Sequence, residues 1–258
     1  MSYLEKTNAM VVDYGNTLVL DPFLRILKTR SSRFQKLLDA RGYGTRWPEI
    51  AKLWIEKNEE INFPFISHFY QEEAIVEQTL LSAGIANSKD VAIISSGLLR
   101  EYRQAFKEVL TKDKRRIKVA QTLDFLKNKN VKLAVVSNER QAALDLALRF
   151  YGIRPFFDSV LSSETICIEK PDARIFSRVL EILMSRPENA VYVGDDLERD
   201  IIPAKKIGMT AVLYIPPRKY SLKTSWRSCD YSNSNPDFII KRFSELKQLF
   251  WHITKEKQ

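Results

Sequence analysis

The stretch AMVVDYGNTLVLDPF, residues 9–23, decides which fold this chain can adopt. Its apolar run from Ala9 to Val12 predicts a short buried strand, and Asp13 follows directly at the end of that strand. In an open parallel sheet, ligands bind beyond the carboxyl ends of the strands. Whether Asp13 is a simple turn residue or part of a site therefore depends on what ends the other strands.

The second half of the chain alternates apolar runs with helical patterns. Strands are predicted at 131–137, 159–163, 190–196 (running into a loop), 210–214 and the start of 237–251. Two segments between them repeat apolar residues along one helix face: Leu144, Ala147, Leu148 and Tyr151, then Ile175, Phe176, Val179, Leu180 and Leu183. Gly152 is expected to end the first of these helices, and Gly208 closes a short helix over 197–208. This alternation predicts an α/β fold whose Rossmann-like parallel sheet carries helices on both faces and includes the strand at 9–12.

Residues 20 to 116 follow a different pattern. Helical periodicity covers 22–42, 48–60, 67–83 and 88–112, and the apolar run 91–99 continues into a helix and is not assigned to a strand. Asp21 and Pro22 fit an N-cap and a first helical position. The basic run 112–118 is interpreted as a solvated hinge. We therefore expect two domains, a core formed by 1–20 and 116–258 and an all-helical domain formed by 21–115.

Composition limits the functions that this chain can have. Hydrophobic residues make up 45% and charged residues 28% of the 258 residues, which is ordinary for a soluble globular protein. The formal net charge of +9 favours an anionic substrate or partner, but nucleic acid is not expected because no recognisable binding module is present. A lysine-rich surface is the commoner explanation of such a charge.

Cysteine and histidine are too scarce to support several kinds of site. The two cysteines, Cys167 and Cys229, provide neither a disulfide framework nor zinc-ligand spacing. Two histidines leave little material for a Ser-His-Asp or Cys-His mechanism. The polar N-terminus lacks the apolar segment of a signal peptide, and no run is long enough to span a membrane. A reducing, cytoplasmic setting is expected.

Polar side chains recur where the predicted strands end. The following residues stand at strand ends or in the loops beyond them: Asp13, Ser137 and Asn138, Lys170, then Asp195 and Asp196 with Asp200 further on. Each alone is a common turn or capping residue. Because the carboxyl ends of parallel strands meet at one edge of the sheet, all of them together predict a single site.

The residue types at that edge suggest phosphoryl transfer. Asp13 and Asp195 supply hard oxygen ligands suited to magnesium, which binds a few carboxylates together with water and substrate phosphate. Lys170 would neutralise charge on the phosphoryl oxygens, and Ser137 would donate a hydrogen bond to the same group. Asp13 would attack phosphorus and form an aspartyl phosphate that water later cleaves.

Four short motifs resemble those of the haloacid dehalogenase (HAD) superfamily, and the resemblance spans nearly the whole chain. They are Asp13-Tyr14-Gly15-Asn16-Thr17-Leu18, Ser137-Asn138, Lys170-Pro171-Asp172 and Gly194-Asp195-Asp196. The resemblance implies a Rossmann-like core that carries the chemistry and a helical cap, inserted after the first strand, that selects a small phosphorylated substrate. Taken together, the motifs are highly specific for the superfamily but carry little information about the substrate.

The resemblance also implies roles for individual residues, with Mg²⁺ as cofactor. The predicted catalytic residues are Asp13 as nucleophile, Thr17, Ser137 and Lys170. The predicted substrate-binding residues are Ser137, Asn138, Lys170 and Asn16. The predicted metal site comprises Asp13, the backbone carbonyl of Gly15, Asp195, and Asp200 as a supporting carboxylate whose role Asp196 shares or replaces.

Gly15 departs from the pattern of typical phosphatases in the superfamily, which have a second aspartate at this position. That aspartate protonates the leaving group and later activates water, and such acid–base help is worth about 10²–10⁴-fold in rate. The glycine therefore lowers activity, restricts substrates to good leaving groups such as acyl or enol phosphates, or leaves the task to Tyr14, Asp196 or a cap residue.

Two other functions remain open on the sequence alone. One is a catalytically weak or regulatory binding protein on the same fold. The other is a haloacid dehalogenase or a phosphonatase-type hydrolase, since members of both kinds also lack the second aspartate. The acidic motif that begins at Gly194 favours the magnesium-dependent phosphatase over dehalogenation.

Overall fold

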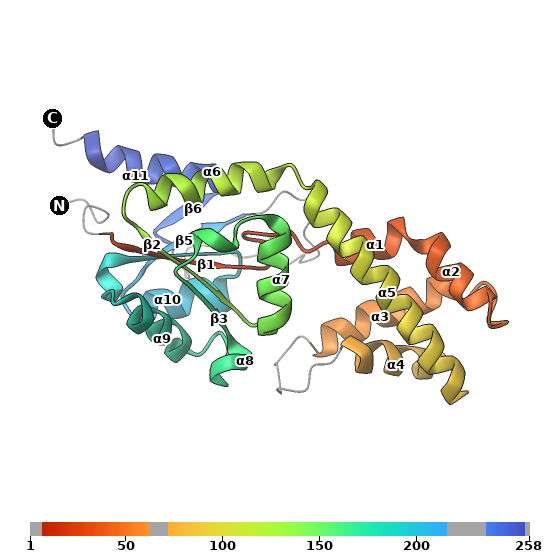
Figure 1. The fold of residues 1–258 in the computed structure, drawn as a ribbon. Coiled ribbons are helices and arrows are strands. Elements are labelled where there is room, and N and C mark those ends of the chain that lie inside the picture. The colour runs from red at the N-terminus through yellow and green to blue at the C-terminus, as the bar shows by residue number, and fades with distance from the viewer. Residues whose placement is uncertain (1–6, 62–71, 216–235, 256–258) are drawn as a thin grey trace. The chain divides into compact units, whose positions relative to one another are not determined.

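The computed structural model describes residues 7–61, 72–215 and 236–255 of the chain (Figure 1). It divides into two compact units. The first unit contains Met1–Asp21 and Asp113–Gln258, and the second contains Pro22–Lys112. We refer to them as the core unit and the helical unit.

The core unit is built on a six-stranded parallel sheet in the order β3-β2-β1-β4-β5-β6. Its strands are β1 (Ala9–Asp13), β2 (Lys132–Ser137), β3 (Ser159–Ser162), β4 (Ala190–Gly194), β5 (Thr210–Tyr214) and β6 (Phe238–Ile240). Strand β1 lies between β2 and β4, so the chain order reverses at β1. In this fold class such a reversal opens a ligand-binding crevice at the carboxyl ends of the strands, which here include Asp13 and Gly194.

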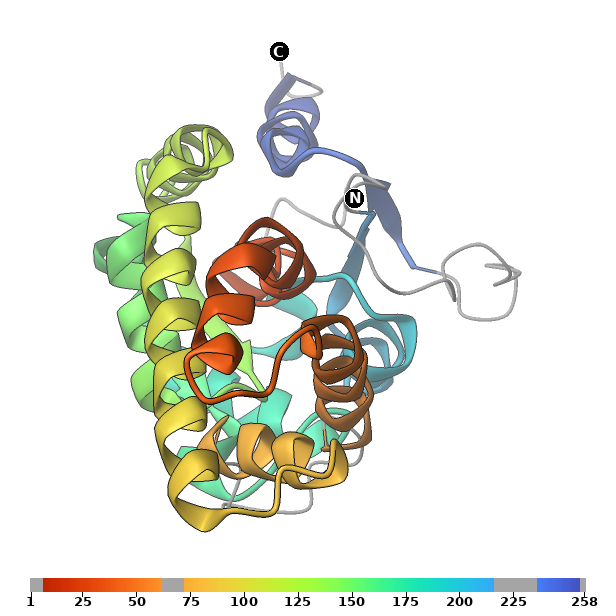
Figure 2. The same cartoon turned by 90° about the vertical axis from the view of Figure 1, so that its right-hand side faces the viewer.

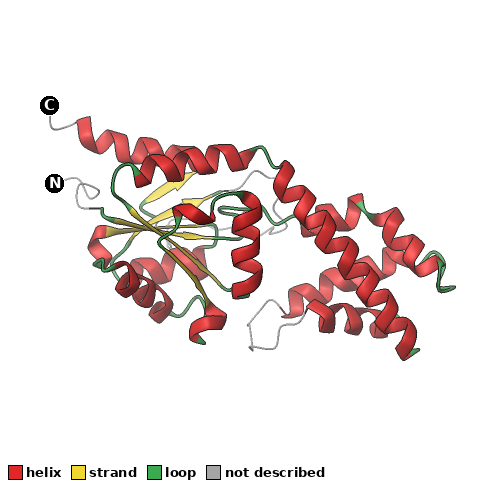
Figure 3. Ribbon diagram, viewed as in Figure 1, coloured by secondary structure: helices red, strands yellow, loops and turns green. Residues whose placement is uncertain are grey.

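Helices cover both faces of this sheet, as Figure 3 shows with the strands in yellow and the helices in red. The core helices are α6 (Arg115–Lys127), α7 (Gln141–Tyr151), α8 (Ser163–Ile166), α9 (Ala173–Leu183), the π-helix η3 (Leu197–Ile201), α10 (Ile202–Lys206) and α11 (Leu246–Lys255). Short 3-10 turns occupy Arg154–Phe156, Pro187–Asn189 and Phe243–Glu245. The predicted α/β fold is therefore confirmed.

Apolar periodicity correctly identified the buried faces of α7 and α9. All the residues predicted for these two faces are buried. Those of α9 pack in one cluster with alternate residues of β1 and β2, including Val11 and Ala134. Burying a large aliphatic or aromatic side chain is worth about 1.5–3 kcal/mol, so these two stripes hold the helices against the sheet.

The helical unit has no strand among its described residues. It contains α1 (Phe23–Thr29), α2 (Ser31–Asp39), α3 (Trp47–Ile61), α4 (Glu72–Ser82) and α5 (Ser88–Lys112). Figure 2 shows the long helix α5, drawn in yellow, with the red and orange helices of the same unit. Its core includes an aromatic group in which Trp54 contacts Phe23 and Phe34 at centroid distances of 5.8 and 6.2 Å. The unit therefore has a hydrophobic core of its own.

Several predicted boundaries in and near the helical unit were wrong. The helical periodicity over 22–42 belongs to two helices that meet at Arg30, whose backbone (φ −104°, ψ 7°) leaves the α region, and it extends beyond the end of the second helix at Asp39. Pro22, not Asp21, is the N-cap of α1. The hinge predicted over 112–118 is much shorter, because α5 ends at Lys112 and α6 begins at Arg115. Charged side chains on an exposed helix face gave that segment the composition of a loop.

Two boundaries in the core unit also differ from the prediction. The strand predicted over 159–163 ends at Ser162, whereas 190–196 is a strand that runs into a loop, as predicted, with the strand ending at Gly194. The short helix predicted over 197–208 begins as a π-helix, in which the N–H groups of both Asp200 and Ile201 donate to the carbonyl of Asp196. Such widened turns occur often at functional sites.

Some residues discussed from the sequence lie outside the described parts of the chain, while others have a clear outcome. His68, Cys229 and the start of the helix predicted over 67–83 lie outside the described residues. Cys167 is an exposed free thiol. In the described parts of the chain, every helix is too short or too polar to cross a bilayer.

Gly152 supplies a test of how α7 ends. It adopts the left-handed conformation (φ +77°), and its N–H donates to the carbonyls of Leu148 and Arg149. We expect Gly152→Ala to lower the free energy of unfolding by about 1–2 kcal/mol, because a side chain is strained in this conformation. Urea unfolding would measure the change. Truncation of the exposed Leu146 to alanine in the same helix is the control, with an expected change below about 0.5 kcal/mol. Equal losses in the two variants would contradict the argument.

Candidate active site

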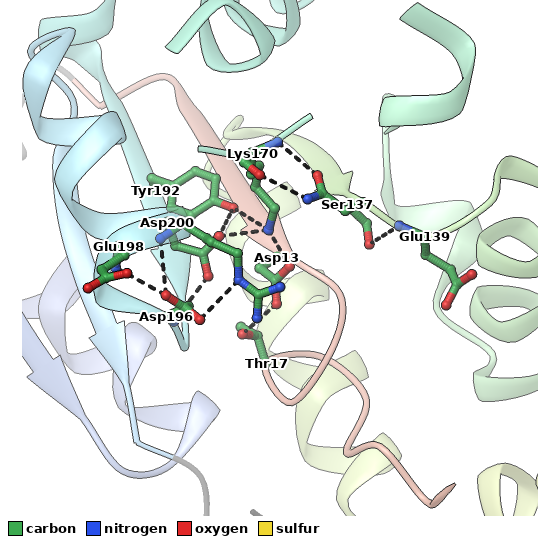
Figure 4. A network of polar contacts seen from close by, with 11 residues as sticks. Asp13, Thr17, Ser137, Glu139, Lys170, Tyr192, Asp196, Glu198 and Asp200 are labelled. Atoms are coloured by element: carbon green, nitrogen blue, oxygen red, sulfur yellow. Dashed lines mark hydrogen bonds and ion pairs between the residues drawn. The ribbon is translucent and has the colours of Figure 1, made fainter. Parts of the chain in front are cut away.

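A buried lysine joins two carboxylates at the carboxyl edge of the sheet (Figure 4). The ammonium Nζ of Lys170 donates to Asp13 Oδ1 and to Asp200 Oδ1, both at 2.6 Å. The three residues are 6%, 5% and 1% exposed, respectively. The phenol oxygen of Tyr192 lies 3.3 Å from the same ammonium and donates to Asp200 Oδ1 at 2.9 Å. The structure therefore brings together three segments that are distant in the sequence.

Asn138 holds the loop that carries the lysine. Its side-chain oxygen accepts from the backbone N–H of Lys170 at 2.8 Å, and its side-chain nitrogen donates to the carbonyl of Lys170 at 3.0 Å. This double hydrogen bond links the end of β2 to the residues that precede α9. It fixes the backbone from which the ammonium reaches the two carboxylates.

The loop after β1 orients the Asp13 carboxylate. The hydroxyl of Thr17, which is fully buried, donates to Asp13 Oδ2 at 3.0 Å. Asn16 has a positive φ of 57°, its N–H donates to the carbonyl of Val19 at 2.7 Å, and its side-chain oxygen accepts from the N–H of Asp21 at 3.2 Å. With Lys170 on Oδ1 and Thr17 on Oδ2, both oxygens of Asp13 are held in place.

The two glycines of the site have opposite surroundings. A Cβ added to Gly15 would meet no heavy atom within 4 Å, so the space next to its Cα is open. A Cβ added to Gly194 would lie 2.5 Å from Asp200 Oδ2 and 2.6 Å from Asp200 Cβ. Position 194 must therefore lack a side chain for Asp200 to reach Lys170.

Two further predicted residues are engaged in local contacts. Ser137, buried at the end of β2, accepts a hydrogen bond from the N–H of Glu139 at 3.1 Å, while the carboxylate of Glu139 points away from the lysine (Figure 4). The carboxylate of Asp196 accepts from the N–H groups of Glu198 and Arg199 and from the Arg199 side chain, at 3.0–3.1 Å. Asp196 thus caps η3, and its backbone contacts Asp200: its N–H donates to Asp200 Oδ2 at 3.1 Å, and its carbonyl accepts from the N–H of Asp200 at 3.0 Å.

Three carboxylates form a cluster that suits a divalent cation. Asp13, Asp195 and Asp200 each offer an oxygen, and these atoms lie within 4.8 Å of one another. Together with Lys170 the three carboxylates carry a formal charge of −2. Buried oxygen ligands of this kind match the preference of Mg²⁺ for hard donors. Among the described residues, the cluster consists of these three aspartates, and Asp196 is not one of them.

Burial and charge set the protonation of the site. Burial raises the pKa of the Asp13 carboxyl to about 6, although the Lys170 charge opposes this shift. Burial acts to lower the pKa of Lys170, but the charges of Asp13 and Asp200 outweigh it and the pKa is raised. Burial, with Asp200 and Asp13, raises the pKa of Tyr192 well above its usual value. At neutral pH the lysine is therefore charged, and the phenol keeps its proton.

Tyr192 is the member of this network that sequence reasoning missed. It stands two residues before Gly194 on β4, so the side chain of Tyr192 shares its strand face with the Gly194 position. A tyrosine inside an apolar strand does signal a buried hydroxyl that needs a partner. The partner itself is not readable from the sequence, because Lys170 and Asp200 reach it from other segments.

The comparisons with known proteins agree with this architecture. A sequence model of the family described as haloacid dehalogenase-like hydrolase matches residues 57–214, and the chain belongs to this family. The matched segment covers Ser137, Lys170, Asp195 and Asp200 but begins after Asp13.

Relatives with assigned names match about half of the chain. The haloacid dehalogenase-like hydrolase domain-containing protein 3 of Bos taurus is 32% identical over 143 residues, which cover 55% of this chain and 55% of that protein. A glyceraldehyde 3-phosphate phosphatase of Methanothermobacter thermautotrophicus is 39% identical over 128 residues, or 50% and 55% of the two chains. The chain therefore spans about half the length of the curated relatives it matches.

The fold is also found among solved structures. That of a HAD phosphatase from Thermococcus onnurineus superimposes with a TM-score of 0.63 at 19% identity, covering 94% of this chain and 97% of that one. A match at this identity shows a shared fold. The predicted membership of the superfamily is confirmed.

The crowding at Gly194 leads to a prediction. In Gly194→Ala the new Cβ would force Asp200 away from Lys170, so we expect Mg²⁺ affinity to fall by about tenfold or more and the midpoint of thermal unfolding to drop. Calorimetric titration with MgCl₂ and thermal unfolding would measure both. Gly15→Ala is a matched control in the same site, because its Cβ enters open space. Magnesium binding that is retained in Gly194→Ala, or lost equally in Gly15→Ala, would contradict the prediction.

Proposed function

We propose that this protein is a magnesium-dependent phosphatase that hydrolyses a small phosphorylated metabolite through an aspartyl phosphate on Asp13. The observation that carries the proposal is the buried Asp13–Lys170–Asp200 network beside the third carboxylate, Asp195. A nucleophilic carboxylate, an anion-binding ammonium and metal ligands are the groups that this reaction needs, and they converge at one sheet edge.

The carboxylates would hold the metal ion. Asp13 and Asp195 are the proposed direct ligands, the backbone carbonyl of Gly15 is a third, and Asp200 supports them; we place Asp196 outside the ligand set because its carboxylate caps η3. Bound Mg²⁺ supplies positive charge that offsets the negative charge developing on the phosphoryl oxygens.

The side chains of the site have separate tasks in the proposed reaction. Lys170 and Ser137 bind the phosphoryl oxygens, while Thr17 and Lys170 keep the Asp13 carboxylate oriented. An oxygen of Asp13 attacks phosphorus, and the bond between phosphorus and the leaving oxygen breaks with its electron pair on that oxygen. Water then attacks phosphorus in the acyl phosphate, which releases phosphate and restores the carboxylate.

Gly15 limits which substrates react quickly. The loop offers no acid to protonate the leaving oxygen, and burial, with Glu139, Asp21 and Asp13, raises the pKa of Tyr14 well above its usual value. A phenol of such high pKa is a poor proton donor in catalysis. Asp196, the remaining candidate of the core unit, is held by three N–H donors. We therefore infer that the preferred substrates are phosphates with good leaving groups, such as acyl phosphates and enol phosphates.

The named relatives and the helical unit support a small substrate. Glyceraldehyde 3-phosphate phosphatase is the name of one relative and phosphoglycolate phosphatase that of another, which supports a small phosphorylated metabolite as the proposed substrate class. We propose that residues 21–115 act as the substrate-selecting cap and that 1–20 with 116–258 carry the chemistry. The proposed setting is the cytoplasm, where such metabolites occur.

A second candidate function is favoured by Gly15 itself. Family members that cleave carbon–halogen or carbon–phosphorus bonds also lack the second aspartate, and a chain that binds phosphate without turnover would need none. These candidates separate in one assay. Halide release from haloacids without metal would support the dehalogenase, whereas metal-dependent phosphate binding with no turnover would support a regulatory binding protein.

The nucleophile can be tested directly. We expect Asp13→Asn to reduce magnesium-dependent phosphate release from acetyl phosphate and para-nitrophenyl phosphate by at least about 10³-fold, because the amide cannot form the intermediate. Asp124→Asn, at an exposed position on α6, is the control of equal charge change and should keep full activity. Phosphate release that survives in Asp13→Asn would assign the activity to another site or a contaminant.

The missing acid at position 15 gives a second prediction. A Cβ at this position meets no heavy atom within 4 Å, so the first carbon of the aspartate side chain in Gly15→Asp enters open space. We expect it to raise kcat by about 10²-fold for alkyl phosphates and by far less for acetyl phosphate, since only the poor leaving group needs a proton. Steady-state kinetics on both substrates would measure the ratio. An equal effect on the two substrates would contradict our account of Gly15.

A further inference from the structure

The ammonium of Lys170 has as many acceptors within hydrogen-bond distance as it has N–H donors. A lysine ammonium carries three N–H donors and has no acceptor. The nitrogen has three acceptors in reach: Asp13 Oδ1 and Asp200 Oδ1 at 2.6 Å and the Tyr192 phenol oxygen at 3.3 Å. With the lysine 6% exposed, these three acceptors surround its ammonium.

A phosphoryl oxygen that binds Lys170 therefore competes with these three acceptors for its N–H groups. Hydrogen bonds between charged partners are shorter and roughly twice as strong as those to neutral groups. The contacts with Asp13 and Asp200 are of this charged kind, whereas the contact with Tyr192 is longer by 0.7 Å and its acceptor is neutral. The hydrogen bond from Lys170 to the Tyr192 phenol is therefore the weakest of the three and the one that a phosphoryl oxygen would replace.

Tyr192 stays in place when the lysine leaves it. Its own proton goes to Asp200 Oδ1 at 2.9 Å, and the other oxygen of that carboxylate accepts from the N–H of Asp196 at 3.1 Å. The tyrosine is fully buried, and its ring packs edge-on against Phe176 at a centroid distance of 4.9 Å. The hydroxyl therefore remains beside the site as a fixed acceptor, available to the lysine whenever no phosphate is bound.

We propose that Tyr192 is a positioning residue whose hydroxyl occupies the third N–H of Lys170 in the free enzyme and is displaced by an oxygen of the bound phosphoryl group. This inference rests on the proposed function, in which Lys170 binds that group. Phosphate binding is then an exchange of one acceptor of Lys170 for another. The free energy of phosphate binding is less favourable by the contribution of the lysine–phenol hydrogen bond that is lost. Tyr192 thereby weakens the retention of the product phosphate.

The test is the affinity of the full-length protein for inorganic phosphate in the presence of Mg²⁺. Tyr192→Phe keeps the ring but removes both the acceptor for Lys170 and the donor to Asp200, so phosphate no longer has a phenol oxygen to displace. We expect its Kd for phosphate, measured by calorimetry, to fall by about 3- to 10-fold, the factor that corresponds to one ordinary hydrogen bond. The KM for acetyl phosphate should fall in the same direction. A residue that only held Lys170 in its place would weaken phosphate binding when changed.

Tyr151→Phe is the matched control. Tyr151 is also buried, and its hydroxyl donates to Asp113 Oδ2 at 2.7 Å, so this variant loses one internal hydrogen bond away from the lysine. We expect it to be destabilised to a similar degree with an unchanged Kd. An unchanged or weaker affinity in Tyr192→Phe, with a wild type that binds and hydrolyses, would overturn the inference and leave the proposed function intact. A wild type that neither binds phosphate nor hydrolyses would overturn both.

A structure of the wild type with bound phosphate provides a second measurement that needs no variant. We expect the distance from Lys170 Nζ to the Tyr192 oxygen to exceed the hydrogen-bonding limit of about 3.5 Å, with the pair to Asp200 retained. A complex in which phosphate contacts Lys170 while the lysine keeps its contacts with Asp13, Asp200 and Tyr192 would overturn the inference. A complex in which the lysine has lost Asp200 and kept Tyr192 would also overturn it.

Discussion

The ammonium of Lys170 between two buried carboxylates is the interaction on which the rest of the site depends. Its contacts with Asp13 and Asp200 are both 2.6 Å long and almost without solvent. Ionised groups are buried at a large desolvation cost, and removing one partner of such a pair costs about 3–5 kcal/mol because it leaves a buried charge unpaired. The strand β1, the loop before α9 and the π-helix after β4 are therefore held in one arrangement.

The sheet topology explains why these segments can meet. Strand β1 lies between β2 and β4, which places the ends of three strands, at Asp13, Ser137 and Gly194, side by side. The carboxylates of Asp13 and Asp195 then lie close to each other without a direct connection in the sequence. The negative charges of these carboxylates repel each other. In the proposed function, the positive charges of Lys170 and of a divalent cation offset this repulsion.

The two glycines of the site show how one residue type serves two purposes. At position 194 the absence of a side chain makes room for Asp200, so the glycine is a packing requirement. At position 15 the surrounding space is open, so nothing in the packing demands a glycine there. Steric crowding therefore explains the glycine at position 194 and not the one at position 15.

The sequence by itself determined the α/β fold, the buried faces of α7 and α9, and the idea that Asp13, Ser137, Lys170 and Asp195 meet, because apolar periodicity reports local burial and parallel strands end at a common edge. Only the tertiary structure decided that Asp200 and Tyr192 hold the lysine, while Asp196 caps a helix. The pair of Lys170 with Asp13 spans 157 residues of chain, so its geometry depends on strand order and loop packing, which no local pattern encodes.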